Sequence, residues 1–347
     1  MNITNTVFGA VNGVEVGLFS LSNDNGLTVK VTNYGGIITS IEMPDREGRI
    51  ENIVCGFDTL EGYLNADYLN NYPYFGCMLG RVANRIAKGR YEIDGQEFTG
   101  VINNGPNHLH GGTVGFDRRI WQAETSLSDN HVCLLLKYTS PDGEEGYPGT
   151  LKAEIMLLLT GNDLGISYTA HTDKPTPVNL SNHTYFNLSG GKENIFNHVL
   201  QLNASTFTEM EANIPTGRIL PVEGTEFDFR APKRLGDGIA RLPQGYDDNY
   251  VIDNPQPHSL VAAAALWEPK SGRRVEIATS QPGLQLYTGY WIPELTVGGV
   301  KKFGRYSGVA LETQHFPDSL HHSHFPSVVL RPDENYREVT AYSFLTE

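Results

Sequence analysis

Histidine, arginine, acidic and amide side chains are concentrated in five short stretches of this chain, where glycine and aromatic residues separate them. The stretches cover residues 80–89, 104–112, 182–190, 245–250 and 310–319. Carboxylate, imidazole, amide and guanidinium groups hydrogen-bond to hydroxyl groups, and aromatic rings pack against apolar faces. This combination is typical of a cleft that binds a sugar.

Two of these residues, His183 and Glu312, could exchange protons with a ligand. An unperturbed imidazole titrates between pH 5 and 8, so His183 can donate or accept a proton at neutral pH. Glu312 follows the apolar run 307–311, and a glutamate at the end of a strand can project into a cleft. Each also has a plainer interpretation, His183 as a core histidine bonded to the backbone and Glu312 as a solvated residue. The pattern alone leaves both interpretations open.

The same stretches offer more candidates than one site can use. His110 lies in a glycine-flanked loop that allows close approach to a ligand. His108, two residues earlier, would point to the opposite face if the loop is extended, so at most one of the two is expected to face a substrate. Arg81 and Arg85 are four residues apart, and spacing does not choose between them.

Further candidates occur near the C-terminal half. Asp247 and Asp248 are adjacent, so in a strand they face opposite ways and only one should meet a ligand. His321, His322 and His324 could be metal ligands, but prolines on both sides favour a solvated loop. The chain has no GxSxG elbow, no Walker A loop and no GxGxxG after a strand, which disfavours serine hydrolases and nucleotide-binding enzymes.

Composition narrows the class of protein. A formal net charge of −14 repels nucleic acid and anionic lipid. No window reaches the roughly 18 consecutive apolar residues of a membrane helix. The N-terminus has neither the basic nor the apolar region of a secretion signal, so we expect a cytoplasmic protein. Cys55, Cys77 and Cys133 lack disulfide or zinc-ligand spacing and are expected to be buried thiols.

The elements that must position these residues are mostly strands. The runs 27–33, 131–138, 151–159 and 165–172 are short and rich in β-branched, aliphatic or aromatic residues, and turn residues separate them. This pattern predicts an all-β antiparallel sandwich that forms one domain over residues 1–347. Residues 59–64 favour a short helix, the alanine-rich run 260–266 fits either a helix or a buried strand, and residues 203–242 favour long ordered loops.

The five stretches, in this order and at these separations, resemble the motifs of the aldose 1-epimerase (galactose mutarotase) family. The most similar motifs are residues 80–87, 109–112, 175–188, 282–289, 316–319 and 325–332, so the resemblance covers nearly the whole chain. It implies a large β-sandwich, often called a supersandwich, with an open concave sugar-binding cleft. It also implies an isomerase that interconverts the α and β anomers of free aldoses such as galactose and glucose.

Carried over position by position, the resemblance makes Glu312 the general base and His183 the general acid. The positions where the family holds the sugar hydroxyls and ring oxygen are Asn84, Arg85, His110, Tyr185, Asp247 and Gln285. The resemblance thereby chooses the second arginine, the second histidine and the first aspartate of the three ambiguous pairs.

The chemistry implied by the resemblance needs two proton carriers. Glu312 removes the proton of the C1 hydroxyl while His183, as an imidazolium, protonates the ring oxygen, and a nearby carboxylate or bound substrate should favour the charged histidine. No metal or organic cofactor is required. The expected partner is a small monosaccharide, and the chain is expected to be a monomer or homodimer without nucleic-acid or membrane partners.

The chain departs from the family pattern at two places near the cleft rim. Asp248 stands where many members have histidine, and Tyr290 and Trp291 replace the more usual Asn-Phe. Both departures bear on the preferred sugar. Three other functions remain as alternatives: a glycoside hydrolase needs a second carboxylate opposite Glu312, a binding module would have lost the acid or the base, and an epimerase for hexose 6-phosphates would show additional basic residues.

Overall fold

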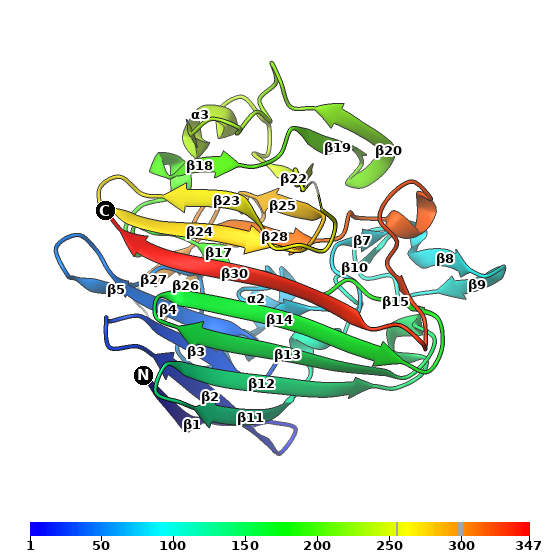
Figure 1. Cartoon of the computed structure of the whole chain (residues 1–347), viewed down its shortest axis with the longest axis horizontal. Coiled ribbons are helices and arrows are strands. Elements are labelled where there is room, and N and C mark those ends of the chain that lie inside the picture. Colours follow the sequence, from blue (N-terminus) through cyan, green and yellow to red (C-terminus); the bar gives the residue numbers. More distant parts are fainter. Residues whose placement is uncertain (255, 298–300) are drawn as a thin grey trace.

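Three antiparallel sheets form the body of the molecule (Figure 1). The computed structural model describes residues 1–254, 256–297 and 301–347. The largest sheet has nine strands, in the order β11 (Gln122–Leu127), β12 (His131–Ser140), β13 (Leu151–Thr160), β14 (Asp163–Thr172), β30 (Tyr336–Thr346), β24 (Arg273–Thr279), β23 (Val261–Trp267), β18 (Val199–Leu202) and β21 (Lys233–Arg234).

Two smaller sheets complete the body. The six-stranded sheet has the order β17 (Tyr185–Phe186), β28 (Val309–Gln314), β25 (Gly283–Tyr287), β22 (Asp247–Val251), β19 (Thr206–Glu211) and β20 (Ile214–Pro221). The five-stranded sheet follows chain order, β1 (Asn2–Val11), β2 (Val14–Ser22), β3 (Thr28–Thr32), β4 (Ile38–Pro44) and β5 (Ile50–Asn52).

Short strand pairs and helices connect the sheets. The pairs are β6 (Met78–Leu79) with β16 (Ser181–Asn182), β7 (Arg85–Ile86) with β10 (His108–Leu109), β8 (Arg90–Ile93) with β9 (Gln96–Thr99), β15 (Thr176–Pro177) with β29 (Val329–Leu330), and β26 (Leu295–Val297) with β27 (Lys301–Phe303). The α-helices are α1 (Leu60–Leu64), α2 (Ala66–Asn70) and α3 (Leu235–Ile239). Single 3₁₀ turns cover Ala87–Gly89, Phe116–Arg118, Glu144–Gly146, Ile195–Asn197 and Ser319–His321. In the part of the chain that the structure describes, no helix is long and apolar enough to cross a membrane.

Alternation along the strands explains how the sheets pack. In β13, Leu151, Ile155 and Leu159 are buried, and the residues between buried positions are exposed or half-buried. This period of two directs one face of the strand to the core. β2–β4 lie behind β11–β13, and β22, β25 and β28 lie behind β23 and β24 (Figure 1). One cluster of buried side chains draws on all three sheets, so they share a core.

The strand predictions agree with the structure, with one exception. The four predicted strands correspond to β3, β12, β13 and β14, the alanine-rich run is β23, and the short helix is α1. The loops expected over residues 203–242 are partly wrong, because β19 and β20 form a hairpin there. Its turn, Ala212–Asn213, has positive φ at both residues, which is the conformation of a two-residue hairpin turn. Asn213 therefore adopts the positive φ that this turn requires, and the turn contains no glycine.

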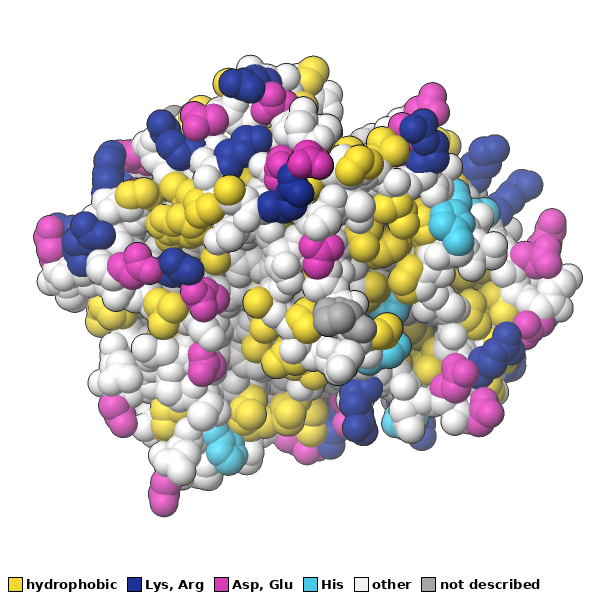
Figure 2. Space-filling model, turned by 45° about the horizontal axis from the view of Figure 1, so that its top comes forward, with side chains coloured by type: hydrophobic (Ala, Val, Ile, Leu, Met, Phe, Trp, Pro, Cys, Tyr) yellow, Lys and Arg dark blue, Asp and Glu magenta, His cyan; other side chains and the backbone are white. Residues whose placement is uncertain are grey.

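The distribution of charged side chains and the burial of the cysteines can be compared with the sequence predictions. Figure 2 shows acidic and basic side chains interspersed over the face it draws. Cys55 and Cys77 are buried, as expected, whereas Cys133 is half-buried.

Candidate active site

A cleft of about 370 Å³ gathers most of the candidate residues. Strands β17, β22, β25 and β28 contribute one side, and the loops around β7 and β10 contribute the other. The lining residues are Asn71, Tyr72, Pro73, Tyr74, Asn84, Arg85, Asn104, Leu109, His110, His183, Tyr185, Asn213, Asp247, Tyr287, Trp291 and Glu312. Seven of the eight residues predicted for the site are among them.

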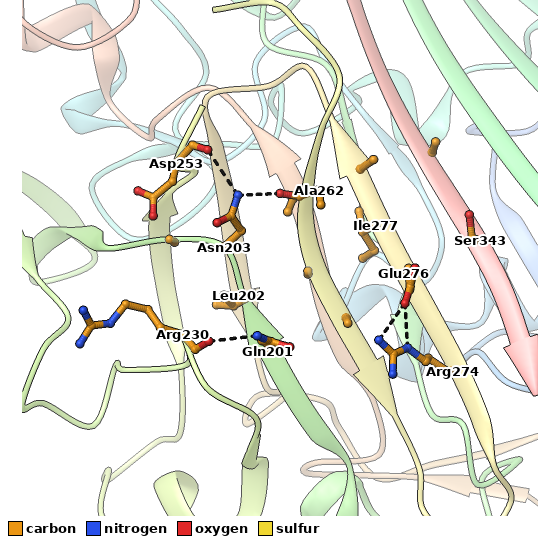
Figure 3. Close-up of a pocket in the computed structure, with 16 residues that line it drawn as sticks. Gln201, Leu202, Asn203, Arg230, Asp253, Ala262, Arg274, Glu276, Ile277 and Ser343 are labelled. Atoms are coloured by element: carbon orange, nitrogen blue, oxygen red, sulfur yellow. Dashed lines mark hydrogen bonds and ion pairs between the residues drawn. The ribbon is translucent and has the colours of Figure 1, made fainter. Parts of the chain in front are cut away.

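A second hollow, of about 530 Å³, lies on the outer face of the nine-stranded sheet and has different chemistry (Figure 3). Its floor is the alanine-rich strand β23. Arg274 pairs with Glu276, and the Asn203 amide donates to the backbone carbonyls of Asp253 and Ala262. None of the described residues that line the hollow is a histidine. The cleft on the other side of the core is thus the better candidate for proton chemistry.

The two predicted proton carriers face one another on the floor of the cleft. Glu312 lies in β28, and His183 lies between β16 and β17. β17 pairs with β28 through Tyr185 and Ala310, which brings these two distant segments of the chain together. His183 Nε2 is 3.5 Å from Glu312 Oε1, and the side chains are 5% and 3% exposed.

Burial shifts the pKa of both groups away from the charged forms. Burial raises the pKa of Glu312 well above its usual range, Asp247 adds to this shift, and Arg85 opposes it. Burial lowers the pKa of His183 to about 3. The expectation of a charged His183 is therefore wrong for the protein alone, because burial disfavours the imidazolium and outweighs the backbone hydrogen bond that favours it. A proton shared by the pair is held mainly by Glu312.

Aromatic rings hold the His183 imidazole in place. Its ring stacks on Tyr185 at a centroid distance of 4.7 Å and on Tyr74 at 5.9 Å. His110 meets its edge at 5.4 Å. Tyr287 contacts both His183 and Tyr185 edge-on. These contacts restrict rotation of the imidazole, so its Nε2 atom stays directed at Glu312.

The backbone of Asn84 fixes the proton position on His110. The Asn84 N–H donates to His110 Nδ1 at 3.0 Å, and the His110 N–H donates to the Asn84 carbonyl at 3.0 Å. Both residues have positive φ, 62° and 49°. Because Nδ1 accepts a hydrogen bond, the neutral ring carries its hydrogen on Nε2. Burial, with help from His183 and Arg85, lowers the pKa of His110 well below its usual value, so the ring is neutral.

The two arginines of the first stretch have different environments. Arg85 lines the cleft, and its Nε donates to Asn104 Oδ1 at 3.2 Å. Arg81 is 2% exposed and turns away from the cleft. Its guanidinium donates to Ser140 Oγ and to the carbonyls of Ser140 and Pro141. Arg85 is thus available to a ligand, whereas Arg81 joins loops of the scaffold.

The two histidines of the second stretch differ in the same way. His110 lines the cleft. His108 is fully buried, and its ring nitrogens lie 2.6 Å from the Val101 carbonyl and 2.6 Å from the Tyr147 hydroxyl. His108 therefore supports the loop that presents its neighbour.

Asp247 and Gln285 form a hydrogen-bonded pair on neighbouring strands, β22 and β25. Gln285 Nε2 donates to Asp247 Oδ1 at 2.7 Å. Gln285 is 1% exposed and lies directly opposite Glu312 in the pairing of β25 with β28, so the two side chains are on the same face of the sheet. The Asp247 N–H donates to Asp248 Oδ2 at 3.1 Å. Burial and the neighbouring Asp247 raise the pKa of Asp248 to about 7.

Among the described residues, His110, His183 and Glu312 are close enough to hold a metal ion together, since their ligand atoms lie within 4.8 Å of one another. This donor set fits a metal poorly. Nδ1 of His110 already accepts the Asn84 N–H, and Nε2 carries the ring hydrogen, so neither nitrogen offers a free lone pair. Two ligands remain, fewer than the three protein ligands of typical catalytic zinc sites.

The histidines of the 321–324 loop bond to the protein itself. His321 Nδ1 lies 2.7 Å from Asp318 Oδ1. His322 and His324 donate through Nε2 to backbone carbonyls of β20, at 3.2 and 2.8 Å. These hydrogen bonds connect the loop to Asp318 and to β20.

Sequence reasoning missed several cleft residues. They are Asn71, Tyr72, Tyr74, Asn104, Asn213 and Tyr287. Tyrosine is common in this chain, so residue type alone could not select the rings that line a cleft. Asn104 begins one of the five stretches and could have been chosen as a partner of Arg85. Asn213 reaches the cleft through the unexpected hairpin, and no local signal marks it.

Comparison with known proteins gives consistent results. Residues 17–343 match the family model described as aldose 1-epimerase. The galactose mutarotase of Bos taurus is 42% identical, over 99% of each chain, and the aldose 1-epimerase of Escherichia coli strain K12 is 34% identical, over 97% of this chain and 98% of that one. Among solved structures, galactose 1-epimerase from Lactobacillus acidophilus superposes with a TM-score of 0.85 at 28% identity, over 99% of each chain.

Proposed function

This chain belongs to the aldose 1-epimerase family and is a mutarotase, an isomerase that interconverts the α and β anomers of free aldoses, and we propose that Glu312 and His183 are its two proton carriers. The observation that supports this assignment is their 3.5 Å approach on the floor of a buried cleft lined by hydrogen-bonding side chains. We further propose galactose and glucose as substrates, since the relatives named above include a galactose mutarotase and a galactose 1-epimerase.

Ring opening moves two protons. The Glu312 carboxylate takes the proton of the C1 hydroxyl, and the His183 imidazolium gives a proton to the ring oxygen, so the C1–O5 bond breaks and the aldehyde forms. Rotation about C1–C2 exposes the other carbonyl face. On closure the two groups exchange roles, and each ends in its original protonation state.

The pair needs only one proton in total, and the protein supplies it internally. With Glu312 protonated and His183 neutral, the pair holds the same number of protons as the reactive carboxylate and imidazolium. Hydroxyl groups that donate to the carboxylate favour its charged form, which offsets part of the burial cost. The proton can then pass to His183 without uptake from solvent.

The remaining cleft residues bind and orient the sugar. His110 donates through Nε2–H, and Arg85 is a second donor, so both can stabilise charge on the ring oxygen. Asn84, Tyr185, Asp247 and Gln285 hold hydroxyls that do not react, and the Gln285 amide also donates to Asp247.

Polarimetry tests the assignment directly. The rotation of fresh α-D-galactose and α-D-glucose is followed with the wild-type protein, Glu312→Gln, His183→Asn and the control Glu276→Gln on the outer face of β24. Each cleft variant should lose a factor of about 10² to 10⁴ in kcat, because each removes one acid-base group. The control should match the wild type. Near-normal kcat in Glu312→Gln would disprove the assignment of the base.

The proposal extends to the domain organisation, the location and the partners of the protein. We propose that residues 1–347 form a single domain, which is supported by the core common to all three sheets. We also propose a cytoplasmic protein that acts on free monosaccharides as a monomer or homodimer, without nucleic-acid partners and without a metal or organic cofactor. Size-exclusion chromatography with light scattering measures the oligomeric state, and activity after chelator treatment tests the independence from metal.

A further inference from the structure

Gln314 is a buried polar residue next to the site to which no role has been given so far. It lies in β28, two residues after Glu312, so both side chains are on the same face of the strand. Gln314 is completely buried and is absent from the cleft lining. It cannot contact a sugar in the cleft directly, so any function must act through a neighbour.

Gln314 reaches Asp247 through one intermediate amide. Its Nε2 donates to Gln285 Oε1 at 3.4 Å and to Asn249 Oδ1 at 3.3 Å. Gln285 Nε2 in turn donates to Asp247 Oδ1 at 2.7 Å. The strand registers place these groups side by side, with Asn249 opposite Gln285 and Gln285 opposite Glu312.

The direction of this chain of hydrogen bonds is fixed by chemistry. A carboxylate only accepts, so Gln285 must turn its NH₂ group to Asp247 and its carbonyl oxygen to Gln314. Two acceptors then face Gln314, and only its NH₂ group can satisfy both. If the Gln285 amide were flipped, its oxygen would lie next to the Asp247 carboxylate oxygen and the two would repel. Gln314 disfavours this flip because its NH₂ group donates to the Gln285 carbonyl oxygen.

The glycine at position 283 leaves room for the side chains of this network. A Cβ atom at Gly283 would lie 2.7 Å from Asn249 Oδ1, so glycine leaves room for the asparagine. The network also leaves Gln314 Oε1 and Asn249 Nδ2 without partners among the described residues, although both are buried. Buried unpaired polar atoms lower stability, so these amides are poorly explained by stability alone.

We propose that Gln314 is a positioning residue for sugar binding, which orients the Gln285 amide and through it the Asp247 carboxylate. The inference rests on the proposed role of Asp247 in holding a sugar hydroxyl. It assigns Gln314 an effect on substrate affinity and leaves proton transfer to Glu312 and His183. Methionine has a similar shape and no amide, so Gln314→Met removes the hydrogen bonds while filling the space.

The test compares Gln314→Met with the matched control Gln281→Met by polarimetry and thermal unfolding. Gln281 is equally buried, but it bonds to Leu180, His315 and Tyr336 outside the cleft. Gln314→Met should raise KM about fivefold to tenfold, with kcat within about threefold and Tm unchanged or higher. Gln281→Met should lower Tm without a change in KM.

Monodeoxy-galactoses locate the effect. Asp247→Asn is first compared with the wild type on each monodeoxy-galactose, and the two should have equal KM on the sugar that lacks the hydroxyl held by Asp247. On this same sugar, Gln314→Met and the wild type should also have equal KM, so their KM ratio should fall to about one. Unchanged KM with lowered Tm, or lowered kcat with unchanged KM, would overturn the proposal. Failure of the proposed function gives a different result, since the wild type would then fail to accelerate mutarotation or Glu312→Gln would match it.

Discussion

The backbone N–H of Asn84 donates to Nδ1 of His110 at 3.0 Å, and this one contact decides what His110 can do. It fixes the hydrogen of the neutral ring on Nε2, so His110 offers a donor and no base. The left-handed backbone of both residues makes the contact possible. The structure thus favours one role for His110, that of a hydrogen-bond donor through Nε2.

Substitutions at His110 can separate the two ring nitrogens. In His110→Asn, the side-chain oxygen can accept the Asn84 N–H, but the distal donor is lost. His110→Gln keeps an N–H group near the position of Nε2. We expect kcat/KM to fall about 10²-fold in the asparagine variant and clearly less in the glutamine variant, as for other donors that stabilise developing charge. Equal losses in the two, with both folded by circular dichroism, would contradict the donor role.

The strands could be predicted from sequence because burial on one face leaves a period of two. The choice between residues in one stretch could not. Arg81 is held by the loop that contains Ser140 and Pro141, and His108 by Tyr147, all far away in the sequence. These partners are contributed by other elements, and local spacing contains no record of them.

Two further features were hidden for the same reason. The hydrogen bond between Gln285 and Asp247 depends on the pairing of β22 with β25, which local spacing does not show. The turn of the β19–β20 hairpin uses Ala212 and Asn213 in place of an Asn-Gly or Gly-Gly pair, so no glycine signal marks it in the sequence. The resemblance to the family supplied the choices within each stretch that spacing could not make.

Lysine substitutions should separate the two arginines. Arg81→Lys cannot reach all the acceptors that the buried guanidinium serves, and the unpaired carbonyls should lower the free energy of unfolding by about 3 kcal/mol. Arg85→Lys should leave stability nearly unchanged and lower kcat/KM about tenfold, because the planar donor toward a ligand is lost. Urea unfolding and polarimetry measure the two effects. A raised KM in the folded Arg81→Lys protein would contradict the prediction that Arg81 acts on stability alone.

The pH profile of kcat/KM should differ from that of an exposed histidine. Burial lowers the pKa of His183 to about 3 and raises that of Glu312 well above its usual range, so the pair holds one proton through neutral pH. Activity should stay flat as pH falls through 6.5, where an unperturbed histidine would titrate. It should fall at alkaline pH, when the pair loses its proton. Rates are corrected for spontaneous mutarotation at each pH, and an acid limb centred near 6.5 would disprove the shared-proton description.

Asp248 should destabilise the protein at alkaline pH, and replacing it should reveal this. Burial and Asp247 raise its pKa to about 7 in the folded protein, against an ordinary value of 3.8. The folded state therefore binds the proton more tightly, and this contribution to stability is lost as pH rises from about 4 to 7. Asp248→Asn has the same shape, and its oxygen can still accept the Asp247 N–H. We expect the variant to be more stable than wild type by roughly 1–2 kcal/mol at pH 8, allowing for the partial exposure of Asp248.

The advantage should shrink strongly near pH 4.5, where the folded wild-type carboxyl is protonated and only ionisation of the unfolded state still contributes. Urea unfolding at both pH values measures the difference, and contributions from other titrating groups cancel between variant and wild type. Asp228→Asn is a matched control of opposite sign, because Arg230 lowers the pKa of Asp228 and the charged carboxylate is favoured. That variant should lose stability at pH 8. An Asp248→Asn difference that is the same at both pH values would mean that shape, and not charge, separates the two side chains.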